Sequence, residues 1–282
     1  MQKRQLVGWG GLALGASSFL VARWHQFGTV ERLSGGKPTG SPIPTLFIHG
    51  YAGTRLSTGP LIRRLAKRGW GQKTAVVRIK DKQHFKMIGD PSLPGSMVQV
   101  LFTNNRLNIM AQTMWLYHLL AVLHWRYRID RVNIVAHSMG AVTVLRYLML
   151  YGQNPAVSLV NKVVMLGGPF NDTDPGKNTF PIEDYPLTVN GPSRQTPLYQ
   201  WFADHQQWID PRTQFLNIAG DIGHGRHSDG IVAVNSVLAL RYLLPPVNYY
   251  EQVVVTGRRA AHSLLHENKE VDQLIGHFLF KR

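Results

Sequence analysis

The chain has 282 residues, of which 44% are hydrophobic and 17% are charged, so it can bury one large core and is not a disordered chain. Cysteine is absent, which excludes disulfides, thiolate catalysis and thiolate metal sites. The net charge of +15 suits an anionic membrane or cell-wall surface. Because no nucleic-acid-binding motif accompanies the basic residues, nucleic acid is not predicted as a partner.

The first 25 residues have the layout of a signal peptide or an N-terminal membrane anchor. Lys3 and Arg4 precede a mostly apolar, uncharged run at residues 6–22, and Arg23 follows it. The run is near the short limit for a bilayer span, which needs about 20 apolar residues. The alternative is a helix packed on the domain. We predict that residues 1–25 direct export and that the protein lies outside the cytoplasm at the cell surface, anchored or secreted.

Residues 26–44 are rich in Gly, Ser, Pro and Thr, which predicts a linker. After it, short apolar runs alternate with helical patterns. Strands are expected at 45–49, 73–79, 131–136, 161–166, 214–219 and 249–256, and helices at 59–68, 108–128, from 137 through Tyr151, and at 271–280. This alternation predicts an α/β fold over residues 45–282, with a mostly parallel central sheet flanked by helices.

A long insertion, residues 171–212, follows the fourth predicted strand. It is polar and proline-containing, and insertions of this length are commonly functional lids or caps. Its aromatic residues are expected to line a pocket under such a cap; the alternative is that they anchor the insertion to the edge of the sheet. These residues are Tyr199, Trp201, Phe202 and Trp208.

The sequence Ala-His-Ser-Met-Gly at residues 136–140 lies between a predicted buried strand and a predicted helix. Strand, tight turn and helix are the context of a nucleophile elbow, in which small residues two before and two after the serine relieve crowding. Ala136 replaces the commoner glycine and adds one methyl group. We predict that Ser138 is a nucleophile, against the alternative of an ordinary turn serine.

His49, Gly50 and Tyr51 end the first predicted strand. The loop at this point in such folds donates one backbone N–H to an oxyanion, and the residue after the nucleophile donates another. We therefore expect the N–H groups of Tyr51 and Met139 to form the oxyanion hole. His49 itself is expected to be structural.

An acid and a base are expected later in the chain, in the order serine, carboxylate, histidine. Asp229, just before a new helix, is the favoured acid, and Asp221 is the alternative. His262, between the last strand and the closing helix, is the favoured base, and His266 is the alternative.

His224, His227 and Asp229 also have a loose spacing that a metal site could use. Close pairs of histidines arise by chance in a chain with twelve of them. We therefore expect neither a metal nor another cofactor.

Four segments together resemble the alpha/beta-hydrolase superfamily, and within it the branch known as Gram-positive cell-surface hydrolases. They are H-G-Y-A-G-T, A-H-S-M-G, S-D-G-I-V and A-H-S-L-L-H-E-N, in that order along residues 45–282. The resemblance implies Ser138 as nucleophile, Asp229 as acid, His262 as base, and Tyr51 with Met139 as oxyanion donors.

The activity expected from this resemblance is hydrolysis of carboxylic esters, esterase- or lipase-like, on a small-molecule or lipid substrate, by a monomer. A peptidase or acyltransferase of the same fold is one alternative. An exported binding or scaffold protein without turnover is the other.

Overall fold

The computed structural model describes residues 42–81, 84–106, 108–176, 181–223 and 225–280. The predicted leader, residues 1–25, and most of the predicted linker lie outside these ranges. The described residues form one α/β structure and belong to the predicted domain.

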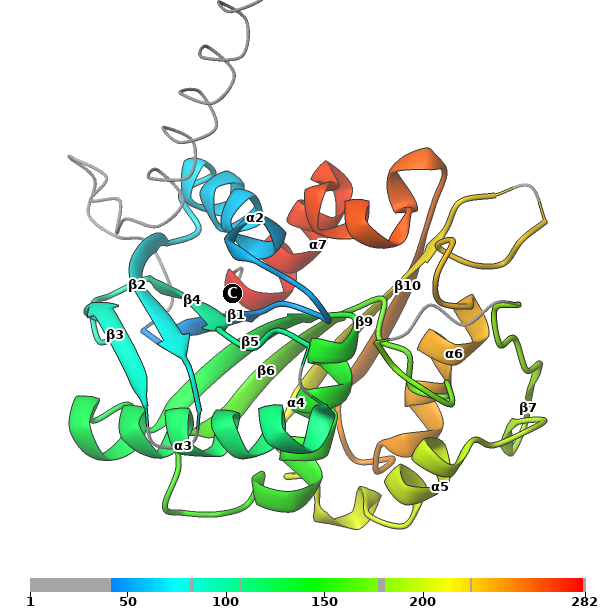
Figure 1. Ribbon diagram of the computed structural model, residues 1–282, viewed down its shortest axis with the longest axis horizontal. Coiled ribbons are helices and arrows are strands. Elements are labelled where there is room, and N and C mark those ends of the chain that lie inside the picture. The colour runs from blue at the N-terminus through cyan, green and yellow to red at the C-terminus, as the bar shows by residue number, and fades with distance from the viewer. Residues whose placement is uncertain (1–41, 82–83, 107, 177–180, 224, 281–282) are drawn as a thin grey trace, which may run out of the picture.

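Within the described residues, eight strands form one sheet in the spatial order β10-β9-β6-β5-β1-β4-β2-β3 (Figure 1). Their bounds are β1 Thr45–Ile48, β2 Gln72–Ile79, β3 Phe85–Gly89, β4 Ser96–Phe102, β5 Arg131–His137, β6 Leu159–Leu166, β9 Gln214–Asp221 and β10 Tyr250–Thr256. Neighbouring strands are parallel except at the edge, where β3 runs antiparallel to β2. The predicted mostly parallel sheet is therefore confirmed.

Helices cover both faces of the sheet (Figure 1). One face carries α2 (Arg55–Lys67) and α7 (Lys269–Phe280), and the other carries α3 (Ile109–Tyr127), α4 (Met139–Tyr151) and α6 (Val234–Leu238) with the 3-10 helix η2 (Ala239–Leu243). Strand β1 shows how the two layers share one sheet. Phe47 belongs to the apolar core with α2 and α7, whereas Leu46 and Ile48 belong to the core with α3 and α4. Side chains of successive strand residues point to opposite faces, so β1 is apolar throughout.

Two strands of the central sheet, β3 and β4, were not among the predicted elements. Strand β4 lies between β1 and β2 and is buried along its whole length, including the polar side chain of Gln99. Gln99 interrupts the apolar run that would mark a buried strand. Its burial is tolerated because its amide accepts from Lys73 Nζ at 2.8 Å and donates to the Arg55 carbonyl oxygen at 2.9 Å. Tertiary hydrogen bonds thus override the sequence pattern.

The insertion at 171–212 lies between the adjacent strands β6 and β9, as predicted. It contains the short hairpin β7 (Leu187–Thr188) and β8 (Gly191–Pro192), the helix α5 (Pro197–Ala203) and the 3-10 helix η1 (Gln206–Trp208). Helix α5 begins where the Thr196 hydroxyl accepts from the Tyr199 N–H, with Pro197 in the first helical position.

The expectation that the aromatic residues of the insertion line a pocket over the serine is wrong. Tyr199 and Phe202 share one face of α5 and are buried in the α3–α4 core. The Arg146 guanidinium lies 3.9 Å from the centre of the Trp201 ring. Arg146 follows Ser138 by eight residues, which places it about 12 Å along α4 from the serine at 1.5 Å per residue. The i, i+3 spacing of Tyr199 and Phe202 was the signal for anchoring, because it places both on one helical face.

Phe202→Ala is expected to lower the free energy of unfolding by about 3–5 kcal/mol, because the ring is fully buried and its removal leaves a cavity. Trp208→Ala is the matched control, since that aromatic side chain is 58% exposed and should change the same quantity by no more than about 0.5 kcal/mol. Denaturant unfolding of both variants measures the difference. Equal losses would contradict the anchoring role of α5.

Candidate active site

Ser138 lies in a strained turn between β5 and α4. Its backbone has φ 56° and ψ −131°, a conformation that L-residues rarely adopt and that costs of order 1–3 kcal/mol. Neighbouring glycines permit the turn. A Cβ on Gly50 would lie 2.7 Å from Ser138 Cβ, and one on Gly140 would lie 2.5 Å from the His49 carbonyl oxygen. The backbone around the serine is therefore packed too tightly for side chains at these two positions.

Ser138, His262 and Asp229 form a continuous hydrogen-bonded chain. Ser138 Oγ lies 2.8 Å from His262 Nε2, and His262 Nδ1 lies 2.7 Å from Asp229 Oδ2. Because a carboxylate oxygen can only accept, Nδ1–H donates to Asp229 and leaves Nε2 free to accept the serine proton. The structure thus brings together the three residues that the sequence selected for nucleophile, base and acid.

The Asp229 carboxylate is buried, and both of its oxygens accept hydrogen bonds. Its second oxygen, Oδ1, accepts from the backbone N–H groups of Ile231 at 2.9 Å and Val232 at 2.7 Å. These two donors stabilise the ionised carboxylate and fix its plane. The tight turn at residues 228–232 therefore holds Oδ2 in position for the imidazole.

The two alternative residues lie elsewhere. The Asp221 carboxylate accepts from the Gly223 N–H at 2.8 Å and is 3.9 Å from the exposed imidazole of His227. His266 is buried with its ring against His137 at 4.8 Å between centroids. Among the described contacts, neither side chain forms a hydrogen bond with the serine. The geometry favours Asp229 and His262 over both alternatives.

The loop after β1 lies against the serine. His49 is buried; its Nδ1–H donates to the Gly50 carbonyl oxygen at 2.8 Å, and its Nε2 accepts from the Phe102 N–H at 3.1 Å. Burial lowers the pKa of His49, so the ring is neutral and structural, as predicted. Gly50, the residue before Tyr51, lies close to Ser138, and Met139 follows Ser138 as the first residue of α4. The service of the Tyr51 and Met139 N–H groups as oxyanion donors stays a prediction.

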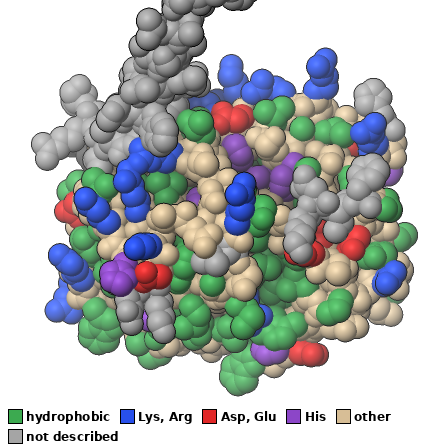
Figure 2. Space-filling view, in the orientation of Figure 1, with side chains coloured by type: hydrophobic (Ala, Val, Ile, Leu, Met, Phe, Trp, Pro, Cys, Tyr) green, Lys and Arg blue, Asp and Glu red, His purple; other side chains and the backbone are tan. Residues whose placement is uncertain are grey.

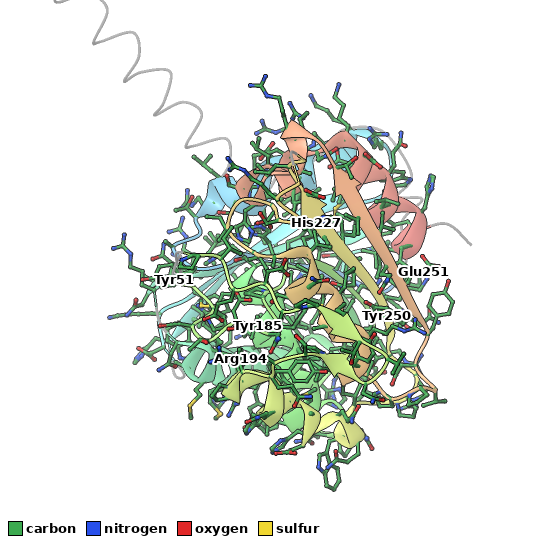
Figure 3. All side chains as sticks on the ribbon, turned by 90° about the vertical axis from the view of Figure 1, so that its right-hand side faces the viewer. Tyr51, Tyr185, Arg194, His227, Tyr250 and Glu251 are labelled. Carbon is green, nitrogen blue, oxygen red and sulfur yellow. The ribbon has the colours of Figure 1, made fainter. Side chains whose placement is uncertain are left out.

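The part of the insertion that approaches the site is its beginning and not α5. A Cβ on Gly176 would lie 2.9 Å from Met139 Sδ and 3.0 Å from the ring of Tyr51. The Tyr51 side chain is 40% exposed and lies at the surface (Figure 3). The beginning of the insertion therefore lies against the side chains of Met139, the residue after the nucleophile, and Tyr51.

The buried carboxyl group of Asp172 lies near the site. The sequence analysis did not identify this residue. Burial raises the pKa of Asp172 to about 6, although the Ser236 hydroxyl, which donates to it at 2.5 Å, acts in the opposite direction. The charges of Glu183 and then Asp229 add to the rise in this pKa, and that of His262 opposes it. No sequence pattern marks Asp172, because only the fold brings residues 172 and 236 together.

His137 was visible in the elbow motif but was given no role. Its Nε2 lies 2.9 Å from the His262 carbonyl oxygen, and the centres of the two rings are 4.7 Å apart. Burial, followed by the charges of His262 and His266, lowers the pKa of His137 well below its usual range. The ring is therefore neutral, and Nε2 carries the proton.

The loose spacing of His224, His227 and Asp229 left a metal site as an alternative that the sequence did not favour. His224 lies outside the described residues, and among the remaining ones no group of three or more His, Asp or Glu side chains could hold a metal ion.

Comparison with known proteins gives a family and a fold. Among curated proteins, none matches this chain. A crystal structure of the lin2722 gene product of Listeria innocua is 26% identical, with a TM-score of 0.77 over 86% of this chain and 95% of that one. A "putative cell surface hydrolase" from Lactobacillus plantarum is 21% identical, with a TM-score of 0.67 over 84% and 91%. The Bacillus licheniformis lipase BlEst2 is 14% identical, with a TM-score of 0.52 over 87% and 96%.

The last two likenesses are under 25% identical and show the fold alone. The family model that matches is described as an alpha/beta hydrolase of unknown function (DUF915), and it covers residues 37–282. That range includes all the described residues and the hydrogen-bonded chain from Ser138 to Asp229. The chain therefore belongs to this family of alpha/beta hydrolases.

Proposed function

We propose that this chain is a serine-dependent hydrolase of carboxylic esters, acting as a monomer on a small-molecule or lipid ester. The observation that carries the proposal is the 2.8 Å contact between Ser138 Oγ and His262 Nε2, with Asp229 at 2.7 Å behind the ring. An ordinary turn serine would not need a strained backbone aligned with a histidine and a buried carboxylate. Membership of an alpha/beta-hydrolase family supports the same reaction class.

In the proposed reaction, His262 Nε2 accepts the proton from Ser138 as Oγ attacks the ester carbonyl carbon. The carbonyl oxygen becomes an oxyanion and accepts from the N–H groups of Tyr51 and Met139, each worth about 3 kcal/mol of transition-state stabilisation. The imidazolium then gives its proton to the departing alcohol, leaving the acyl group on Ser138.

Water then hydrolyses the acyl-enzyme, with His262 again acting as base and then as acid. His262 takes a proton from the water, which attacks the acyl-enzyme carbonyl, and returns a proton to Ser138 as the carboxylic acid leaves. Asp229 keeps the imidazole in the tautomer with hydrogen on Nδ1 and stabilises its positive charge. Esters are favoured over amides or acyl transfer, as the fold neighbours include a lipase; this rests on analogy of fold.

Ser138→Ala should abolish hydrolysis of short-chain p-nitrophenyl esters and covalent labelling by a fluorophosphonate probe, because no other group in the proposed site can form the acyl-enzyme. Ser263→Ala is the matched control: this serine follows the base in the chain, is exposed, and should keep both activities. Mass spectrometry of the labelled peptide gives the site. Wild-type protein that resists the probe would favour the scaffold alternative, and labelling that survives Ser138→Ala would refute the nucleophile.

Asp229→Asn and His262→Ala should each lower kcat by orders of magnitude, because both act in one proton relay. Asp221→Asn and His266→Ala are the matched changes at the alternative positions and should cost far less. Ester hydrolysis by the four variants at one pH measures this ordering. If the second pair were the more damaging, the assignment of acid and base would be wrong although the serine mechanism could still hold.

We also propose that the domain lies outside the cytoplasmic membrane. The basic residues before the apolar run at 6–22 support this, together with the fold likeness to a protein named a cell surface hydrolase. None of the helices in the described part of the chain is long and apolar enough to cross a bilayer.

An anionic membrane or wall polymer is the proposed surface partner. Lys and Arg side chains project from the edge of the molecule that α2 and α7 form (Figure 2). Those that are exposed there include Lys67, Arg68, Arg258, Arg259 and Lys269. Their attraction to an anionic surface is long-ranged and weakens with salt.

Protease added to wall-stripped protoplasts should digest the full-length protein, because the positive-inside rule places Lys3 and Arg4 in the cytoplasm and the domain outside. The same protein without residues 1–25 should stay inside and resist digestion. Immunoblots of treated and untreated cells give the measurement. Protection of the full-length protein, with recovery in the cytosolic fraction, would contradict export.

A further inference from the structure

We propose that His137 is a positioning residue that holds the base-bearing segment, residues 261–268, against the nucleophile elbow. The inference rests on the proposed function and extends it to a side chain that contacts neither substrate nor the serine proton. It is carried by a hydrogen bond from the His137 ring to the main chain of His262.

The direction of that bond is fixed by chemistry. A carbonyl oxygen can only accept, so His137 Nε2–H donates to the His262 oxygen at 2.9 Å. The ring is neutral and 6% exposed, so water offers no ready substitute donor. Because His137 is the last residue of β5 and directly precedes Ser138, its ring moves with the elbow.

The backbone N–H of His262 also forms a hydrogen bond. It donates to the Asp229 carbonyl oxygen at 2.9 Å. The main chain of His262 is therefore tied on one side to the residue before the nucleophile and on the other side to the acid itself. The side chain of His262 contacts the same two places, Asp229 itself and Ser138, which directly follows His137. Loss of either of these two hydrogen bonds to the main chain of His262 would let the imidazole move relative to both Ser138 and Asp229.

The outer side of the same segment is fastened by Arg64 from α2. Its guanidinium donates to the His266 carbonyl oxygen at 2.6 Å and to the carboxylates of Glu267 and Asp272, each at 2.7 Å. Arg64 thus anchors residues 266–272 to the helical layer, several residues beyond the base. The bonds that act at the main chain of His262 itself are the one from His137 and the one to the Asp229 carbonyl oxygen.

Packing and hydrogen bonding can be separated because a second ring occupies a matched place. His137 touches His262 at 4.7 Å between centroids and His266 at 4.8 Å. His266 therefore shares the packing of this cluster, yet among the described contacts its ring forms no bond with the main chain of His262. A purely structural role would make both histidines equally important.

The experiment compares four proteins: wild type, His137→Phe, His137→Gln and His266→Phe. Phenylalanine keeps a ring but removes the donor, whereas the terminal amide of glutamine can place an N–H near the position of Nε2. We expect His137→Phe to lower kcat roughly 100-fold, the scale of a misplaced catalytic group, with KM changed less than about twofold. The rate of fluorophosphonate labelling should fall in parallel.

His137→Gln should recover kcat to within about tenfold of wild type, and His266→Phe should stay within about threefold while losing as much melting temperature as His137→Phe. Should the phenyl ring prevent folding, His137→Asn replaces it, since that shorter amide does not reach the carbonyl. Full kcat in the variant without the donor, equal losses in Phe and Gln, or losses that follow melting temperature in all variants would overturn the proposal. Wild-type protein inert to the probe would instead refute the proposed function.

Discussion

The strained turn at Ser138 constrains everything around it. A left-handed backbone at a non-glycine residue persists only when the surrounding structure over-determines it, and here two glycines make that possible. Gly50 brings the loop after β1 against the serine, and Gly140 lets α4 begin against the His49 carbonyl. The sheet order follows from the same requirement, since β1 must lie beside β5 for these loops to meet.

Around that fixed point, the remaining groups come from loops at the carboxyl ends of strands. Asp229 follows β9 and His262 follows β10, on the side of β5 opposite to β1. Parallel strands deliver all these loops to one edge of the sheet, which is where ligand sites in such sheets form. The base is held there by hydrogen bonds from its ring and its N–H to Asp229 and from the His137 ring to its carbonyl oxygen.

The sequence alone was sufficient for the parts of this structure that local pattern determines. The elbow needs a buried strand, a small-residue turn and a helix in immediate succession, so Ser138 could be placed from residues 131–151. The choice of Asp229 over Asp221 depended on its place before a helix, and only the fold shows that its Oδ2 meets His262. Strand β4 was not predicted because the buried Gln99 interrupts its apolar run. The aromatic residues of α5 were misplaced because their helix was not recognised, and with it the face that buries Tyr199 and Phe202.

The place of β4 in the sheet has a consequence for how the chain is made. Thr45 pairs with Met97 on one side and with Asn133 on the other, so the central strand β1 has no sequence-local partner. During synthesis this apolar strand has no partner until residue 97 has left the ribosome, and its second edge stays unpaired until residue 133 has followed. Non-local pairing of this kind slows folding and exposes apolar strands to aggregation. The nascent chain is therefore expected to depend on chaperones until the nucleophile strand itself has emerged.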